Sequence, residues 1–216
     1  MCTQNTSESS GSDFGLPLSS DEFRSLWDRR EKPFERQCPY MPSLPLLLNG
    51  KLVEDLERMN AENAGNLYVT PVAYGGDLAL AAFTDRKDML SEAQKVIDSA
   101  ELHWLMEERA IGCLPEGAPA PQVLDCHDVL DLRGERLRTP PNRSWKDLSL
   151  VPRREFLNWD NCIRSVDVCA YPYSAYSEKE FHGVEHFINF RCGFNPTVFG
   201  INTSSLVNWG TNPPDF

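Results

Sequence analysis

Two short apolar segments separated by a pair of glycines constrain the fold of this chain more than any other feature. Residues 66–73 and 77–83 are apolar in short bursts, and Gly75 and Gly76 lie between them. Such a pattern is typical of a β-hairpin, because glycine adopts the backbone angles that a tight turn requires. We therefore predict a hairpin over residues 66–83.

A helix is predicted directly after this hairpin. Thr84 and Asp85 are suitable N-cap residues. Apolar residues then recur every three or four positions, which places them on one helix face: Met89, Ala93, Val96, Ala100 and Trp104. A similar spacing predicts an earlier helix over residues 46–59, with Leu48, Leu52, Leu56 and Met59 on one face.

The remaining pattern indicates an α+β fold, with an antiparallel sheet and flanking helices. Strands are predicted at 123–132 and 166–173, and short strands or packed coil at 195–216. Residues 1–20 are rich in serine, threonine and glycine and are expected to form a disordered tail. Residues 21–216 are expected to form a single globular domain; if it has two lobes, the proline-rich connector at 115–122 divides them.

Composition narrows the class of protein. The chain has no apolar run of 18 residues, which predicts that it has no transmembrane segment. It begins without a basic, hydrophobic leader, and its seven cysteines are an odd number, so we expect reduced thiols and a cytoplasmic location. A net charge of −11 opposes binding to nucleic acid. The acidity serves solubility alone, or it forms a surface that docks on a basic protein partner.

A candidate partner-binding element precedes the domain core. Phe23, Leu26 and Trp27 follow serine and acidic residues at helical spacing. Their apolar face would either occupy a groove on a partner or pack on the domain itself.

The densest chemistry lies in residues 176–193. Residues 183–187 are Gly-Val-Glu-His-Phe, and 191–193 are Arg-Cys-Gly. This stretch resembles the lecithin retinol acyltransferase-like (H-box/NC) family, in which Asn-Cys-Glu-His-Phe precedes Arg-Tyr-Gly. The resemblance covers about residues 123–200 and implies a papain-like fold in the C-terminal half. It also implies a nucleophilic cysteine at a helix start, where the helix dipole lowers the thiol pKa.

Val184 stands where that family has its nucleophile, so the resemblance implies a domain that has lost acyl transfer and works by binding. His127 has the outline of the family's upstream base; His103 is a rival, but it lies on a predicted helix. An active acyl-transfer or hydrolytic enzyme would need a different nucleophile. The catalytic candidates are His127, Glu185, His186 and Cys192.

Two metal-based interpretations of the same stretch remain open, although no cofactor is the first expectation. A zinc-stabilised interaction module would use Cys162, Cys169, His182 and His186. Histidines four apart on a helix can share a zinc ion, but the six-residue gap between the cysteines is wider than a zinc knuckle. His-x-x-Glu-His at 182–186 also matches inverted zinc peptidases, yet no glutamate follows it as a third ligand. A plain core helix at this position is the structural alternative.

Overall fold

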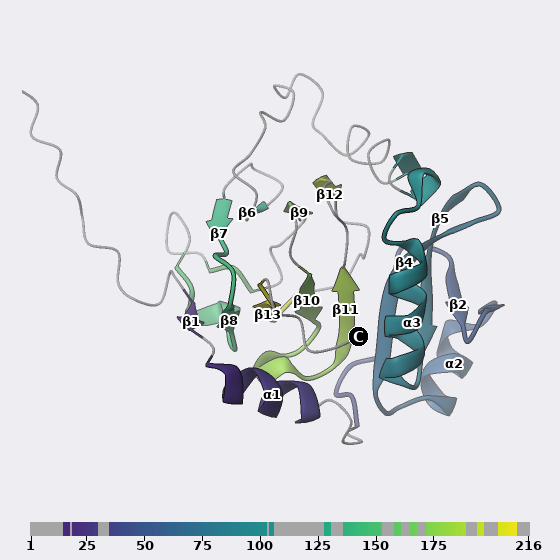
Figure 1. The fold of residues 1–216 in the computed structure, drawn as a ribbon. Helices are drawn as coiled ribbons and strands as arrows, with labels where there is room; N and C mark the ends of the chain where they lie inside the picture. Colours follow the sequence, from purple (N-terminus) through teal and green to yellow (C-terminus); the bar gives the residue numbers. More distant parts are fainter. Residues whose placement is uncertain are drawn as a thin grey trace, which may run out of the picture.

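The computed structural model describes residues 15–17, 19–29, 35–102, 104–105, 128–130, 136–152, 158–160, 165–167, 172–188, 194–196 and 203–210. These residues form a large sheet, a smaller sheet and several helices (Figure 1). The main helices are α1 (Ser20–Arg29), α2 (Leu56–Glu62) and α3 (Arg86–Val96), with short 3₁₀ turns η1 (Leu148–Leu150) and η3 (Lys179–Phe181).

The large sheet has nine strands, and its order mixes the two halves of the chain. From edge to edge the strands are β1 (Leu16–Pro17), β8 (Arg143–Trp145), β13 (Ser205–Asn208), β10 (Tyr173–Tyr176), β11 (Val184–Ile188), β4 (Leu67–Tyr74), β5 (Asp77–Phe83), β2 (Leu46–Leu48) and β3 (Lys51–Leu52). Neighbours are antiparallel except at β11–β4 and β5–β2, which are parallel. The predicted α+β class is confirmed, and the predicted antiparallel sheet is mostly antiparallel, with two parallel pairings; the papain-like arrangement stays a prediction.

A second sheet has the order β12 (Phe194–Pro196), β9 (Ser165–Asp167), β6 (Asp128–Leu130) and β7 (Arg136–Arg138), and all its pairings are antiparallel. The predicted connector at 115–122 lies outside the described residues. The large sheet contains strands from both sides of it, hydrogen-bonded together at β4 and β11. Among the described residues, no helix is both long and apolar enough to cross a membrane.

The hairpin and the start of the following helix are confirmed. Strands β4 and β5 pair up to Tyr74 and Asp77, and both turn glycines have positive φ. The Asp85 side chain accepts a hydrogen bond from the Lys87 backbone N–H at 2.7 Å and caps α3. The helix ends at Val96, however, and residues 100–102 and 104–105 are helical again with a different buried face. Trp104 is 58% exposed there, while Leu102 and Leu105 are buried.

Three sequence predictions are wrong in detail. Residues 46–59 are not one helix, because Asn49 and Gly50 both have positive φ and turn the chain from β2 into β3. The tail predicted over residues 1–20 is wrong at its C-terminal end, since Leu16 and Pro17 pair with β8 and α1 begins at Ser20; residues 1–14 lie outside the described residues. The strand predicted at 166–173 is instead two strands, β9 and β10, which lie in different sheets.

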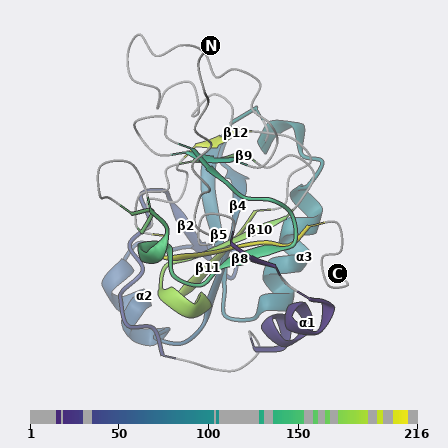
Figure 2. The same cartoon turned by 90° about the vertical axis from the view of Figure 1, so that its left-hand side faces the viewer.

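The core occupies both faces of the large sheet, because the side chains of its central strands alternate between them. In β11, Val184, His186 and Ile188 are on one face, and Glu185 and Phe187 are on the other. Met59 of α2 packs on the first face, and residues of α1 and α3 pack on the second. Figure 2 shows α2 and α3 on opposite sides of the sheet.

Candidate functional site

The acyltransferase-like stretch begins a strand rather than a helix, which corrects the predicted local structure. Val184 to Ile188 form β11, paired with β10 on one side and with β4 on the other. Gly183 has a φ of 80°, and a Cβ there would collide with the Ser177 hydroxyl. It therefore ends the turn between β10 and β11, a position that favours glycine.

A strand here removes the physical basis expected for an activated thiol. Without a helix start at residue 183, the helix dipole cannot lower the pKa of a group at position 184. The Val184 side chain is almost fully buried among the apolar core residues of the first face. A thiol at this position would be shielded from solvent, and burial raises a thiol pKa.

Glu185 is a buried carboxylate held by several donors. Arg86 Nε donates to Glu185 Oε2 at 2.9 Å, and Arg86 Nη2 donates to Oε1 at 3.0 Å. The hydroxyls of Ser174 and Tyr176 also donate to Oε1, at 2.6 and 3.0 Å. Trp209 Nε1 in turn donates to Ser174 Oγ at 2.7 Å. Glu185 is 1% exposed, so the group is a closed polar network inside the second-face core.

The geometry of this network favours a structural role for Glu185. The two Arg86 contacts form a bidentate pair, an arrangement that compensates a buried carboxylate well. Burial lowers the pKa of Arg86, but attraction and hydrogen bonds from Glu185 outweigh it and raise that pKa overall. Arg86 therefore stays charged, and neither side chain of the pair is exposed where a substrate could reach it.

His186 lies on the opposite face of β11 and is also fully buried. Its ring packs against the Tyr40 ring, with the centroids 5.5 Å apart. Desolvation lowers the His186 pKa to about 3, although the charge of Glu185 acts in the other direction. The imidazole is therefore neutral at physiological pH, and its pKa is far below that of an efficient general base.

The zinc interpretation loses its helical histidine pair. His182 is exposed in the turn before β11, whereas His186 is buried within that strand. Cys162 and Cys169, the other two predicted ligands, lie outside the described residues. Within the part of the chain that the structure describes, no group of three or more histidine, cysteine, aspartate or glutamate residues is placed to hold a metal ion.

The other candidates are placed only in part. His127, His103 and Cys192 lie outside the described residues. Helix α1 forms as predicted, and Leu26 is buried in its own domain against the second-face core. That side chain is thus unavailable to a partner, while the Phe23 and Trp27 side chains are outside those described.

Sequence reasoning missed the partners of Glu185. Its donors Arg86, Ser174 and Tyr176 come from α3 and β10, and Trp209, which donates to Ser174, follows β13, so no local motif links them. One signal was present, because an arginine in the first turn of a helix opposes the helix dipole. Arg86 directly follows the N-cap Asp85, which suggests a compensating carboxylate without identifying it.

Comparison with known proteins adds no identification. No protein-family model matches the chain, and no curated protein or solved structure matches it either.

We expect the buried ion pair to be strongly coupled. Glu185→Leu or Arg86→Met alone should each lower the free energy of unfolding by about 3–5 kcal/mol, because each leaves an uncompensated buried charge. The double variant Arg86→Met/Glu185→Leu should lose much less than the sum of the two. Urea unfolding of the four proteins measures this, with Arg58→Met, which breaks the exposed pair to Glu62, as the control. Additive losses would contradict a coupled pair.

Stability should also depend on pH through His186. Its pKa is about 3 in the folded protein and near 6.5 when unfolded, so the unfolded state binds the proton more readily. Stability from this group is complete above pH 6.5 and is lost as the pH falls toward 3. We expect a loss of about 2 kcal/mol between pH 7 and pH 5. His186→Gln should remove this slope in urea titrations, and the exposed-site control His182→Gln should keep it.

Proposed function

We propose that this chain is a non-catalytic binding protein that docks a basic protein partner on an acidic sheet edge. The observation that carries the proposal is the burial of Glu185 and His186 in a central strand. Neither side chain is exposed where a substrate could contact it, and each is already in contact with other side chains. In this proposal the chain carries a degenerate form of the H-box/NC motif. The glutamate and histidine of that motif, Glu185 and His186, are part of the protein core.

The free edge at β3 supports the docking part of the proposal. In the β2–β3 hairpin the Val53 N–H donates to the Leu46 carbonyl at 2.8 Å, and Leu52 is opposite Leu47. Hydrogen-bonded and non-bonded pairs alternate in antiparallel strands, so the backbone N–H and C=O of Leu52 face away from β2. Among the described strands none pairs with β3 on that side. The Leu52 side chain is also 48% exposed.

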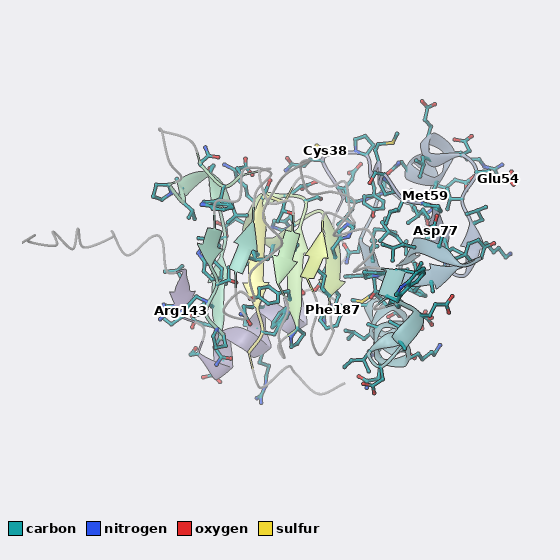
Figure 3. The ribbon with its side chains drawn as sticks, turned by 90° about the horizontal axis from the view of Figure 1, so that it is seen from above. Cys38, Glu54, Met59, Asp77, Arg143 and Phe187 are labelled. Atoms are coloured by element: carbon teal, nitrogen blue, oxygen red, sulfur yellow. The ribbon has the colours of Figure 1, made fainter. Side chains whose placement is uncertain are left out.

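Exposed carboxylates follow β3 in the chain and also lie in α2 and at the start of β5. We define the acidic edge as Leu52 together with the exposed carboxylates Glu54, Asp55, Glu57, Glu62 and Asp77. Figure 3 shows Glu54 and Asp77 at the same end of the molecule. Lys51 and Arg58 are the basic residues of this stretch, and Arg58 is paired with Glu62. A partner strand carrying lysine or arginine would complement both the open backbone groups and the charge.

The opposite edge of the sheet is less suited to pairing. It ends in β1, where Pro17 has no N–H to donate. Strand β1 also contains only Leu16 besides this proline. An added strand is therefore better accommodated at β3.

The absence of catalysis can be tested by restoring the family's cysteine. Val184→Cys should gain no thiol-dependent ester hydrolysis, because the new thiol is buried in a strand and its pKa is raised rather than lowered. Iodoacetamide labelling followed by peptide mass spectrometry should show that this thiol reacts more slowly than the exposed Cys38. Rapid labelling of position 184 at neutral pH, or appearance of esterase activity, would refute the proposal.

Docking can be tested with a short synthetic peptide of alternating lysine and valine, labelled for fluorescence anisotropy. Glu54→Lys/Glu57→Lys should weaken its binding by about tenfold through loss of charge complementarity. The matched control is Asp88→Lys/Glu101→Lys, which has the same net charge and also changes one first-turn residue of a helix. Leu52→Pro should weaken binding too, because it removes the outward N–H. Equal losses in both charge variants would mean that only the net charge attracts the peptide.

A further inference from the structure

Residues 35–41 form a segment that is fixed against α2 and the turn before β11. The Arg36 N–H donates to the Ala64 carbonyl at 2.9 Å. The Tyr40 N–H donates to Asn60 Oδ1 at 2.7 Å, and Asn60 Nδ2 donates back to the Tyr40 carbonyl at 2.9 Å. On the other side, the Gln37 N–H donates to Glu178 Oε1 at 2.8 Å. The backbone of this segment is therefore held at both ends.

The segment directs two polar side chains inward. Arg36 is 9% exposed and Tyr40 is 2% exposed, whereas residues 37–39 between them are exposed. Figure 3 shows Cys38 at the outer surface of the molecule. The two inward side chains thus lie directly beneath a single stretch of surface backbone.

Several hydrogen-bond donors of these side chains have no acceptor. Arg36 Nη2 donates to the Asn63 carbonyl, but no described residue accepts from Arg36 Nε or Nη1. The Tyr40 hydroxyl likewise has no partner among the described residues. A buried donor without an acceptor costs free energy, and a buried charge without a counter-ion costs more. The native protein is therefore more stable with an acceptor at this place.

The missing acceptor should carry negative charge. No ion pair involving Arg36 is formed in the described part of the chain, although Glu178 attracts it from a distance. One oxygen of Glu178 already accepts from the Gln37 N–H. Burial lowers the Arg36 pKa and raises the Tyr40 pKa well above 10, so at neutral pH the pair presents one cation and one neutral hydroxyl donor. A water molecule could accept these hydrogen bonds but would leave the cation uncompensated.

We propose that Arg36 and Tyr40 form a binding site for one small oxyanion, a carboxylate or a phosphate. Arg36 Nε, Arg36 Nη1 and the Tyr40 hydroxyl supply the donors, and the guanidinium supplies the charge. The occupant is small because the donor atoms lie beneath the surface. This site lies on the same sheet face as His186, and it is independent of the acidic edge and of the function proposed for that edge.

Thermal unfolding of the full chain tests the proposal, with sodium acetate or sodium phosphate replacing sodium chloride at equal ionic strength and pH 7. At a hundredfold excess over the dissociation constant, one oxyanion should raise the melting temperature by about 5 °C or more, and the rise should saturate. Arg36→Gln should lose the saturable part. Arg58→Gln is the matched control, since it removes an exposed arginine and should respond as the wild type does. The stronger of the acetate and phosphate responses identifies a carboxylate or a phosphate ligand.

General stabilisation by phosphate does not saturate. It would raise the melting temperatures of the wild type, Arg36→Gln and Arg58→Gln equally. That result would overturn the proposal, and so would a wild-type melting temperature in acetate and in phosphate that equals the one in chloride. Glu178→Gln sharpens the test, because removing a competing carboxylate should strengthen oxyanion binding. If Glu178 were instead the counter-ion, this variant would be less stable in chloride and the wild type would not respond. If Arg36→Gln does not fold, the shift of the Arg36 Nε resonance of the wild type during an acetate or phosphate titration gives the same answer.

Discussion

The ion pair between Arg86 and Glu185 joins the two halves of the large sheet. Arg86 comes from the helix that follows the early hairpin, and Glu185 comes from a strand about 100 residues later. Those halves meet where β11 runs parallel to β4, with only Val184 to His186 in register opposite Leu67 to Val69. A junction of three residue pairs is short, so the bidentate contact across it fixes both its register and the position of α3.

A buried ion pair adds little to the free energy of folding, but it selects one register of the strands that carry it. Desolvation of both groups offsets much of their attraction, but any other register would leave Glu185 buried without Arg86. A one-residue slip of β11 would move Glu185 to the first face and His186 to the second. The hydroxyls of Ser174 and Tyr176 fit only the observed register as well. The register of strand β11 is therefore set by Glu185 rather than by the apolar residues of the strand.

Local signals in the sequence were sufficient where the structure is local. Gly75 and Gly76 predicted the hairpin, and Asp85 predicted the start of α3. Asn49-Gly50 is an equally clear turn signal inside residues 46–59, but the four-residue spacing of leucines predicts a helix across it. A helix spacing can thus arise by chance across a hairpin, whereas a positive-φ dipeptide within it is harder to accommodate in a helix.

The stretch at residues 183–188 could not be assigned in the same way, because its conformation is set by distant strands. Val184, His186 and Ile188 alternate with Glu185 and Phe187, but every one of them is buried, so the polar residues do not mark a solvent face. Alternation of polar and apolar residues identifies a strand only when one face of the sheet is exposed to solvent. Glu185 and His186 resemble a catalytic pair in sequence, yet the strand turns them to opposite faces of the sheet and into separate cores.

Among the described residues, the polar groups proposed to bind a ligand or a partner lie in the first half of the chain. In the described C-terminal strands β10, β11 and β13 every side chain is buried, so a ligand could reach them only if the sheet opened. Residues 36–62 instead carry the open backbone of Leu52, and the buried Arg36 and Tyr40 beneath the exposed residues 37–39. Because β2 anchors this region to β5, binding there need not disturb β11. The described part of the reactive stretch, residues 176–188, thus contributes mainly to the core, and the two proposed binding surfaces lie in a stretch without a motif.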